Sequence, residues 1–145
     1  MVSTVSSETW VGASTACPSD GWQCIAARGR LFDAHNSSMW QPYGAWSLQV
    51  DAELGNDGYA DYGLDNLTFG STGVTIPKAI IGTYNGTGYI NETQYMLGMF
   101  GLGVVPGKFP PLNSPVPAVS ALVEDLGVIP SHSWGYTAGA KYRES

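Results

Sequence analysis

The 145 residues of this chain are enough for one domain with a hydrophobic core of its own. A net charge of -6, with six lysines and arginines that are scattered rather than clustered, excludes a basic patch, so we expect no nucleic-acid partner. No apolar stretch reaches the roughly 20 residues of a bilayer-spanning helix, so we predict no membrane span. Few charged residues and abundant glycine, proline and aromatic residues are typical of a β-rich, turn-rich extracellular protein.

A turn-rich loop between Cys17 and Cys24 is the first local feature along the chain. The two cysteines are close enough in sequence to pair and would close a short loop. The alternative, a structural metal site, normally needs four ligands, and the chain has no second cysteine pair. Its two histidines lack a supporting carboxylate pattern. We therefore predict a disulfide, no metal site and no cofactor.

A β-hairpin is predicted in the middle of the chain. Between residues 48 and 54 apolar and polar side chains alternate, which indicates a strand with one buried face. The sequence Asn56-Asp57-Gly58 tolerates positive φ and predicts the turn. Residues 64–69 form the expected return strand, which ends at Gly70.

Two further β segments follow the hairpin. Residues 74–81 predict a pair of strands interrupted by Pro77, and the proline favours a place at the edge of a sheet because it has no N–H to donate. Residues 96–105 are too short and too glycine-rich for a membrane helix, and they predict a buried strand and a turn.

One helix is predicted, at residues 118–126. Its apolar residues recur at i, i+3, i+4 and i+7 and form one face, which comprises Val119, Leu122, Val123 and Leu126. Prolines precede the segment, and Gly127 is expected to end it. Since the chain shows no internal repeat or linker, we predict an all-β domain over residues 1–145 with one or two short helices.

The segment 2–11 reads Val-Ser-Thr-Val-Ser-Ser-Glu-Thr-Trp-Val. It resembles the active-site strand and loop of the pepsin-like aspartic peptidases, which read apolar, Asp, Thr, Gly, Ser, Ser, acidic or amide, any residue, Trp, Val. Ser3 stands where that family has its catalytic aspartate, and Val5 stands where it has the loop glycine. Thr4 and Ser6 match the family. The resemblance implies a peptidase scaffold with a degenerate catalytic position.

Four later segments extend the resemblance over nearly the whole chain: residues 30–40, 48–70, 97–103 and 117–133. The second resembles the flap hairpin and implies a flap made of Leu54, Gly55, Asn56, Asp57 and Gly58, with Leu54 in place of the family's tyrosine. The third resembles the motif that threads under the active-site loop. The fourth resembles the helix and turn that close the first lobe, and residues 131–140 resemble secreted fungal homologues.

The fold that this resemblance implies is a single pepsin-like N-terminal lobe, a β-barrel or sandwich. It lacks the strands that normally precede the catalytic loop, and it lacks the second lobe. An isolated lobe of this kind would expose the apolar face that normally meets the second lobe. The expected partner at that face is the missing lobe or a second copy of the chain.

The chemistry of the family needs two carboxylates that share one proton, and each lobe supplies one of them. No aspartate in this chain is followed by Ser or Thr and then Gly. The hydroxyl of Ser3 cannot act as the base, because the pKa of a serine hydroxyl lies far above working pH. The chain is therefore expected to be catalytically inactive and to retain a peptide or protein ligand in its cleft or at its surface.

Four sequons for N-glycosylation indicate the compartment: Asn36, Asn66, Asn85 and Asn91. Together with the predicted disulfide they favour a secreted or cell-surface protein. The chain begins with Met1-Val2-Ser3 and shows neither the basic nor the apolar segment of a signal peptide. We therefore expect it to be a mature fragment, an engineered form or a shortened gene model.

One alternative function stays open, a carbohydrate-binding or other β-sandwich interaction module. Trp10, Trp40, Trp46 and Trp134 could form a platform on which sugar rings stack. Tryptophans at such spacings are, however, more often core residues.

Overall fold

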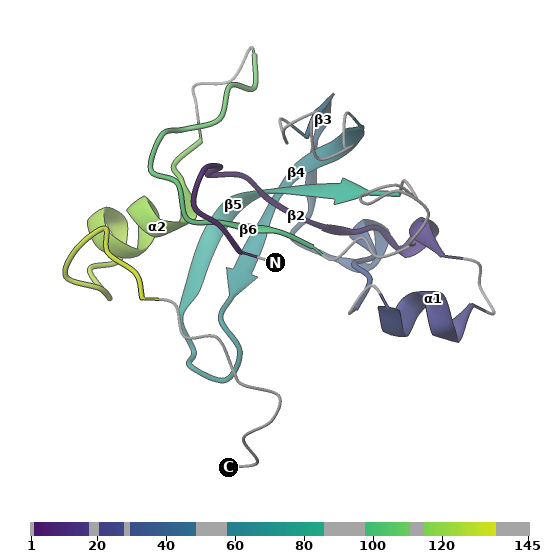
Figure 1. Ribbon diagram of the computed structural model, residues 1–145, viewed down its shortest axis with the longest axis horizontal. Coiled ribbons are helices and arrows are strands. Elements are labelled where there is room, and N and C mark those ends of the chain that lie inside the picture. The colour runs from purple at the N-terminus through teal and green to yellow at the C-terminus, as the bar shows by residue number, and fades with distance from the viewer. Residues whose placement is uncertain are drawn as a thin grey trace.

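A computed structural model of the protein describes residues 2–17, 21–27, 30–48, 58–85, 98–110 and 115–135. Within these ranges the chain is mostly β, with a four-stranded mixed sheet, a two-stranded sheet and two short α-helices (Figure 1). The prediction of a β-rich fold with one or two short helices is confirmed at this level. The described strands do not close into a barrel.

The larger sheet has the order β2-β5-β4-β3. Strand β2 (Thr9–Gly12) runs parallel to β5 (Thr75–Tyr84), which is antiparallel to β4 (Tyr59–Thr68). Strand β4 is in turn antiparallel to β3 (Gln41–Ser47). In the smaller sheet, β1 (Val2–Ser3) and β6 (Phe100–Gly101) are parallel.

The central hairpin begins earlier than the sequence predicts. The return strand predicted at residues 64–69 lies in β4, but its partner β3 ends one residue before the strand predicted at residues 48–54. Leu48 is fully buried, and the rest of the predicted strand lies outside the described residues. Strand β3 was not predicted, because Pro42 and Gly44 interrupt the residue pattern of a strand. Gly44 lies at a register shift with a φ of 146°, a conformation that favours glycine.

Strand β5 corrects the prediction that residues 74–81 form two strands at a sheet edge. It is one continuous strand between β2 and β4. Pro77 is tolerated because β2 pairs only with residues 81–84, so the beginning of β5 has no neighbour on that side among the described strands. The register with β4 also shifts between Asp65 and Leu67, opposite Pro77 and Lys78, which places the proline at a bulge.

Two hydrophobic clusters stabilise the sheet. Side chains alternate along a strand, so the rings of Trp10 and Tyr62 lie on one face, where both flank Gly82. Ile81 points to the other face. The first cluster comprises Trp10, Leu48, Ala60, Tyr62, Tyr84, Met99 and Phe109. The second comprises Ile76, Ala79, Ile81, Ala118 and Ala121.

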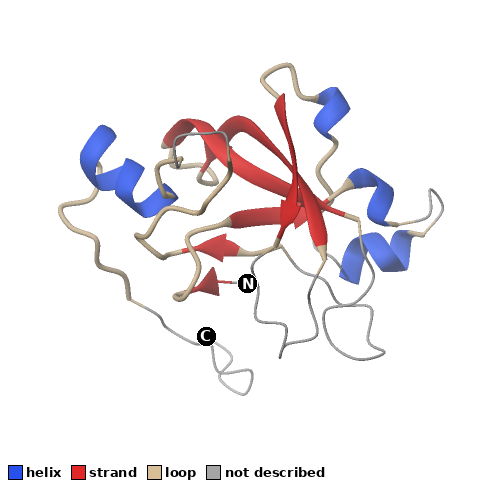
Figure 2. Ribbon diagram, turned by 90° about the horizontal axis from the view of Figure 1, so that it is seen from above, coloured by secondary structure: helices blue, strands red, loops and turns tan. Residues whose placement is uncertain are grey.

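The helices lie at opposite ends of the sheet (Figures 1 and 2). Helix α1 (Trp22–Ala27) follows the 3-10 helix Ser14–Ala16, and a second 3-10 helix spans Ala34–Asn36. Helix α2 (Ala118–Ser120) continues as a π-helix over Ala121–Asp125, where the sequence predicts a helix.

The end of the helical segment is also where the sequence places it, since Gly127 follows with a φ of 60°. The predicted apolar face is only partly buried. Val119 is buried, but Leu126 is 38% exposed. The wider π turn shifts the later residues around the helix axis relative to an ordinary α-helix, which removes Leu126 from the buried face.

Candidate functional site

The Ser3 loop, residues 3–7, is held over the short strand β6. Ser3 pairs with Gly101 in the parallel β1–β6 sheet. The backbone N–H of Leu102 donates to the carbonyl of Ser3 at 2.8 Å, and that of Gly103 donates to the carbonyl of Ser6 at 2.9 Å. The structure therefore brings together two segments that are about a hundred residues apart and that sequence analysis identified separately.

Glycine is required where these segments cross. A Cβ atom at Gly101 would overlap the backbone of Ser7 and lie 2.6 Å from the backbone nitrogen of Glu8. A Cβ atom at Gly103 would lie 2.8 Å from the carbonyl carbon of Ser6. Because backbone atoms cannot move aside cheaply, these two glycines allow the loop to lie directly on the strand.

The serine hydroxyls of the loop hold its shape. The hydroxyl of Ser3 accepts hydrogen bonds from the backbone N–H groups of Val5 (3.3 Å) and Ser6 (3.2 Å). Ser6 accepts from the N–H of Glu8 at 3.0 Å, and Ser7 donates to the carbonyl of Val105 at 2.6 Å. Ser3 and Ser6 therefore act as local caps, Ser7 ties the loop to residue 105, and none of the three contacts a base among the described residues.

Glu8 is the carboxylate nearest to the loop, but it points into the protein. It is only 3% exposed, and its Oε2 accepts a hydrogen bond from the hydroxyl of Tyr62 at 2.7 Å. Its Oε1 is buried and has no hydrogen-bond partner among the described residues. Burial raises the pKa of Glu8 above its usual value, and the bond from Tyr62 only partly offsets this. Burial and the neighbouring carboxyl together raise the pKa of Tyr62 as well.

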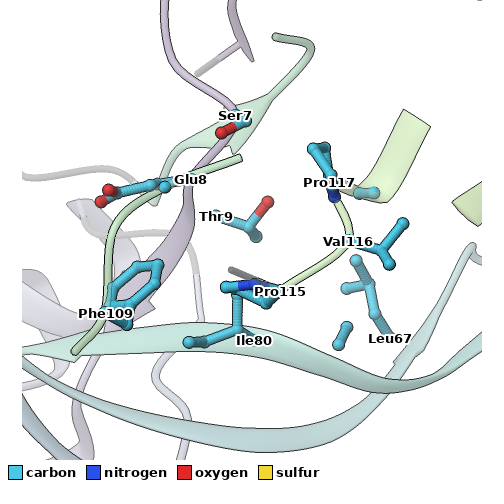
Figure 3. Close-up of a pocket in the computed structure, with 12 residues that line it drawn as sticks. Ser7, Glu8, Thr9, Leu67, Ile80, Phe109, Pro115, Val116 and Pro117 are labelled. Atoms are coloured by element: carbon cyan, nitrogen blue, oxygen red, sulfur yellow. The ribbon is translucent and has the colours of Figure 1, made fainter. Parts of the chain in front are cut away.

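A cavity of about 10 Å³ borders Glu8 (Figure 3). Glu8 and Phe109 lie on one side of it, and Val116 and Pro117 lie on the other. This volume holds at most one water molecule, so the cavity cannot accept a peptide side chain. Glu8 is therefore a structural acid beneath the Ser3 loop.

The stability of the protein should depend on pH through Glu8. Because the folded-state pKa of Glu8 lies above the usual 4.5, the folded chain keeps a proton that the unfolded chain has released. This contribution to stability is fully present below pH 4.5 and is lost as the pH rises through the folded-state pKa. We expect the free energy of unfolding of the wild type, relative to Glu8→Gln, to fall as the pH rises from 4.5 toward neutrality.

Urea denaturation over this pH range measures the difference. The matched control is Asp125→Asn, which removes an equal charge at an exposed position. A constant difference between wild type and Glu8→Gln across the range would show that Glu8 titrates alike in the folded and unfolded states.

Most of the flap that the resemblance implies cannot be placed. Leu54, Gly55, Asn56 and Asp57 lie outside the described residues. Gly58 is described, and its carbonyl accepts a hydrogen bond from the N–H of Leu48 at 3.0 Å. This bond extends the pairing of β3 and β4 by one residue.

Cys17 and Cys24 form the predicted disulfide, with their Cα atoms 5.8 Å apart. The sequon asparagines Asn36, Asn66 and Asn85 are exposed, and Asn91 lies outside the described residues. Over the part of the chain that is described, no group of three or more histidine, cysteine, aspartate or glutamate residues could hold a metal ion. In the same ranges no helix is long and apolar enough to cross a membrane.

One of the four tryptophans proposed for a sugar-stacking platform, Trp10, has no exposed ring surface to offer a ligand. Trp10 is fully buried, Trp40 and Trp46 are partly buried, and Trp134 is 51% exposed. Trp10 and Trp46 belong to the aromatic cluster around Tyr62. The prediction that most of these residues are core residues is confirmed for Trp10.

The chain matches no protein-family model and no curated protein sequence.

Sequence analysis missed two residues of this region, Tyr62 and Phe109. Their rings lie 4.8 Å apart, and Tyr62 binds Glu8. Glu8 directly precedes strand β2, but this position alone does not show that its carboxyl is buried. Nothing in the sequence identifies which of the eight tyrosines donates.

Proposed function

We propose that this chain is a secreted, pepsin-like lobe that binds peptide or protein and does not hydrolyse it. The observation that carries the proposal is the environment of Ser3. Ser3 lies at the end of β1, and its hydroxyl accepts hydrogen bonds from two loop N–H groups. By the resemblance, this is the position of the catalytic aspartate in the pepsin-like family. The same position in an active member would need a carboxylate to take a proton from water.

No other carboxylate replaces the missing one within the loop. Residues 3–7 contain no acid, and the buried carboxylate of Glu8 is bound to Tyr62. A general base must lie within hydrogen-bond distance of the attacking water. The carboxylate of Glu8 is buried and does not meet this requirement. Peptide binding without cleavage is the function that remains for this scaffold. The disulfide between Cys17 and Cys24 also supports the proposed secretion, because such bonds persist in oxidising compartments.

A mixture of fluorescein-labelled octapeptides tests the proposal with the native protein at acidic pH. Fluorescence anisotropy should rise to saturation, and mass spectrometry should find every peptide intact after incubation. A matched sample denatured by heat should give no rise. Truncated peptide masses, or no saturable anisotropy change from the folded protein, would contradict the proposal.

The chain should also associate through an apolar surface beside the Ser3 loop. Val5 is 87% exposed and Val105 is 77% exposed, and the bond from Ser7 to the Val105 carbonyl holds their segments together. Val2 and Val104 extend this exposed valine surface. Apolar side chains gathered in this way are typical of an interface.

We expect sedimentation velocity to detect dimers or larger species at high protein concentration. The double variant Val5→Ser, Val105→Ser should shift the protein toward the monomer. Val128→Ser, which changes an exposed valine elsewhere, is the matched control and should associate as the wild type does. A wild type that stays monomeric at every concentration would exclude self-association through this surface.

A further inference from the structure

A second and larger cavity, of about 320 Å³, lies away from the Ser3 loop. Strands β3, β4 and β5 form one side of it, and residues 13–15 and 32–35 form the other. We call it the Asp61 cavity after the acid on β4. It shares no residue with the Ser3 loop, so an inference about it does not rest on the proposed function.

The Asp61 cavity carries two carboxylates and no described lysine or arginine. Asp33 accepts hydrogen bonds from two neutral groups of the described chain, the N–H of His35 at 3.0 Å and the amide of Asn36 at 2.7 Å. The backbone carbonyl of Asp61 accepts from Thr83, but among the described residues no group donates to its carboxylate or forms an ion pair with it. The negative charge of the cavity is therefore not neutralised by the described part of the chain.

Two aromatic rings complete the wall. Phe32 and Trp40 lie 5.6 Å apart with their planes inclined by 55°. The indole of Trp40 packs directly on Gly63 of β4, where a Cβ atom would overlap it. This close packing fixes the position of the ring on the sheet. Aromatic rings beside carboxylates that no described cation neutralises suit a flat cation, which can stack on a ring and donate hydrogen bonds to a carboxylate.

We propose that the Asp61 cavity binds the side chain of an arginine on a basic peptide or protein partner. The guanidinium is planar, stacks on aromatic rings and donates to carboxylates in a fixed geometry, which matches this lining better than the compact ammonium of lysine does. The net charge of -6 attracts such a partner over a longer range.

Titration with N-acetyl-arginine amide tests this, followed by the NMR signal of the Trp40 indole N–H at about pH 7.5, above the usual range of histidine ionisation. We expect saturation with a dissociation constant of about 1 mM, weaker in high salt. N-acetyl-citrulline amide has nearly the same shape without the charge and should bind at least about tenfold more weakly. N-acetyl-lysine amide should bind with intermediate affinity.

The variant Asp61→Asn should weaken arginine binding by about fivefold or more, whereas Asp125→Asn removes an equal charge elsewhere and should leave binding unchanged. The citrulline comparison uses the wild type, so it decides even if the variant folds poorly. Equal binding of arginine and citrulline, no saturation, or an equal effect of the two variants overturns the proposal. Saturable binding of a neutral sugar such as methyl glucoside in place of arginine would overturn it as well.

Discussion

Replacing Gly101 by alanine is expected to destabilise the protein by about 3 kcal/mol or more. The added Cβ would overlap the backbone of Ser7 and Glu8, so strand β6 or the Ser3 loop must move. Either movement breaks the parallel pairing of β1 with β6 and the hydrogen bond from Leu102 to Ser3. Denaturant unfolding measures the loss directly.

The matched control is Gly135→Ala, since a Cβ atom at that glycine meets no atom of the described residues within 4 Å. This variant should change the free energy of unfolding by less than about 0.5 kcal/mol. If Gly101→Ala were as stable as this control, the loop would not lie on the strand as the structure has it.

Replacing Phe109 by alanine should cost about 3–5 kcal/mol, the usual range for removing a fully buried aromatic ring. Phe109 packs edge-on against Trp46 at 5.5 Å and lies 4.8 Å from the ring of Tyr62. Its removal would open a cavity beside the bond between Tyr62 and Glu8. We therefore expect a lower thermal midpoint. We also expect the pH dependence of the free energy of unfolding that Glu8 causes to become weaker.

Trp134→Ala removes an aromatic side chain of comparable size that is half exposed, and it should leave the thermal midpoint nearly unchanged. Similar losses in the two variants would mean that the ring of Phe109 is not part of the core.

Local patterns predicted the elements whose signals are strong and short in range. The helical segment near residue 118 and its end at Gly127 follow from apolar spacing and from a glycine that accepts positive φ. The disulfide follows from two cysteines with no other partner. Strand β3 was missed because Pro42 and Gly44 break its pattern, and only the pairing with β4 makes it a strand.

Tertiary context decided the other differences. Pro77 suggested an edge, but a strand can lie inside a sheet when its neighbour covers only its second half, as β2 does for β5. The bond between Glu8 and Tyr62 joins residues 54 positions apart, and no local pattern specifies it. The Asp61 cavity likewise combines residues from five segments that the sequence presents separately.

The hydrogen bonds of Ser3 could not be predicted from the sequence. A serine at the end of β1 could equally have pointed to solvent, whereas its hydroxyl accepts the amides of Val5 and Ser6. The hydroxyl accepts hydrogen bonds from the loop N–H groups, as a carboxylate could. This geometry explains how the loop keeps its shape without an acid. A serine hydroxyl at this position is therefore sufficient to hold the two loop amides.

Whether the protein hydrolyses peptides at acidic pH decides between a binding lobe and a peptidase. A fluorogenic peptide is incubated with folded protein at about pH 4, with and without pepstatin, an inhibitor of aspartic peptidases. We predict no turnover above the rate without protein and no effect of pepstatin. Turnover that pepstatin abolishes would contradict the proposal that this lobe binds peptides without hydrolysing them, because a catalytic carboxylate would then have to act beside Ser3.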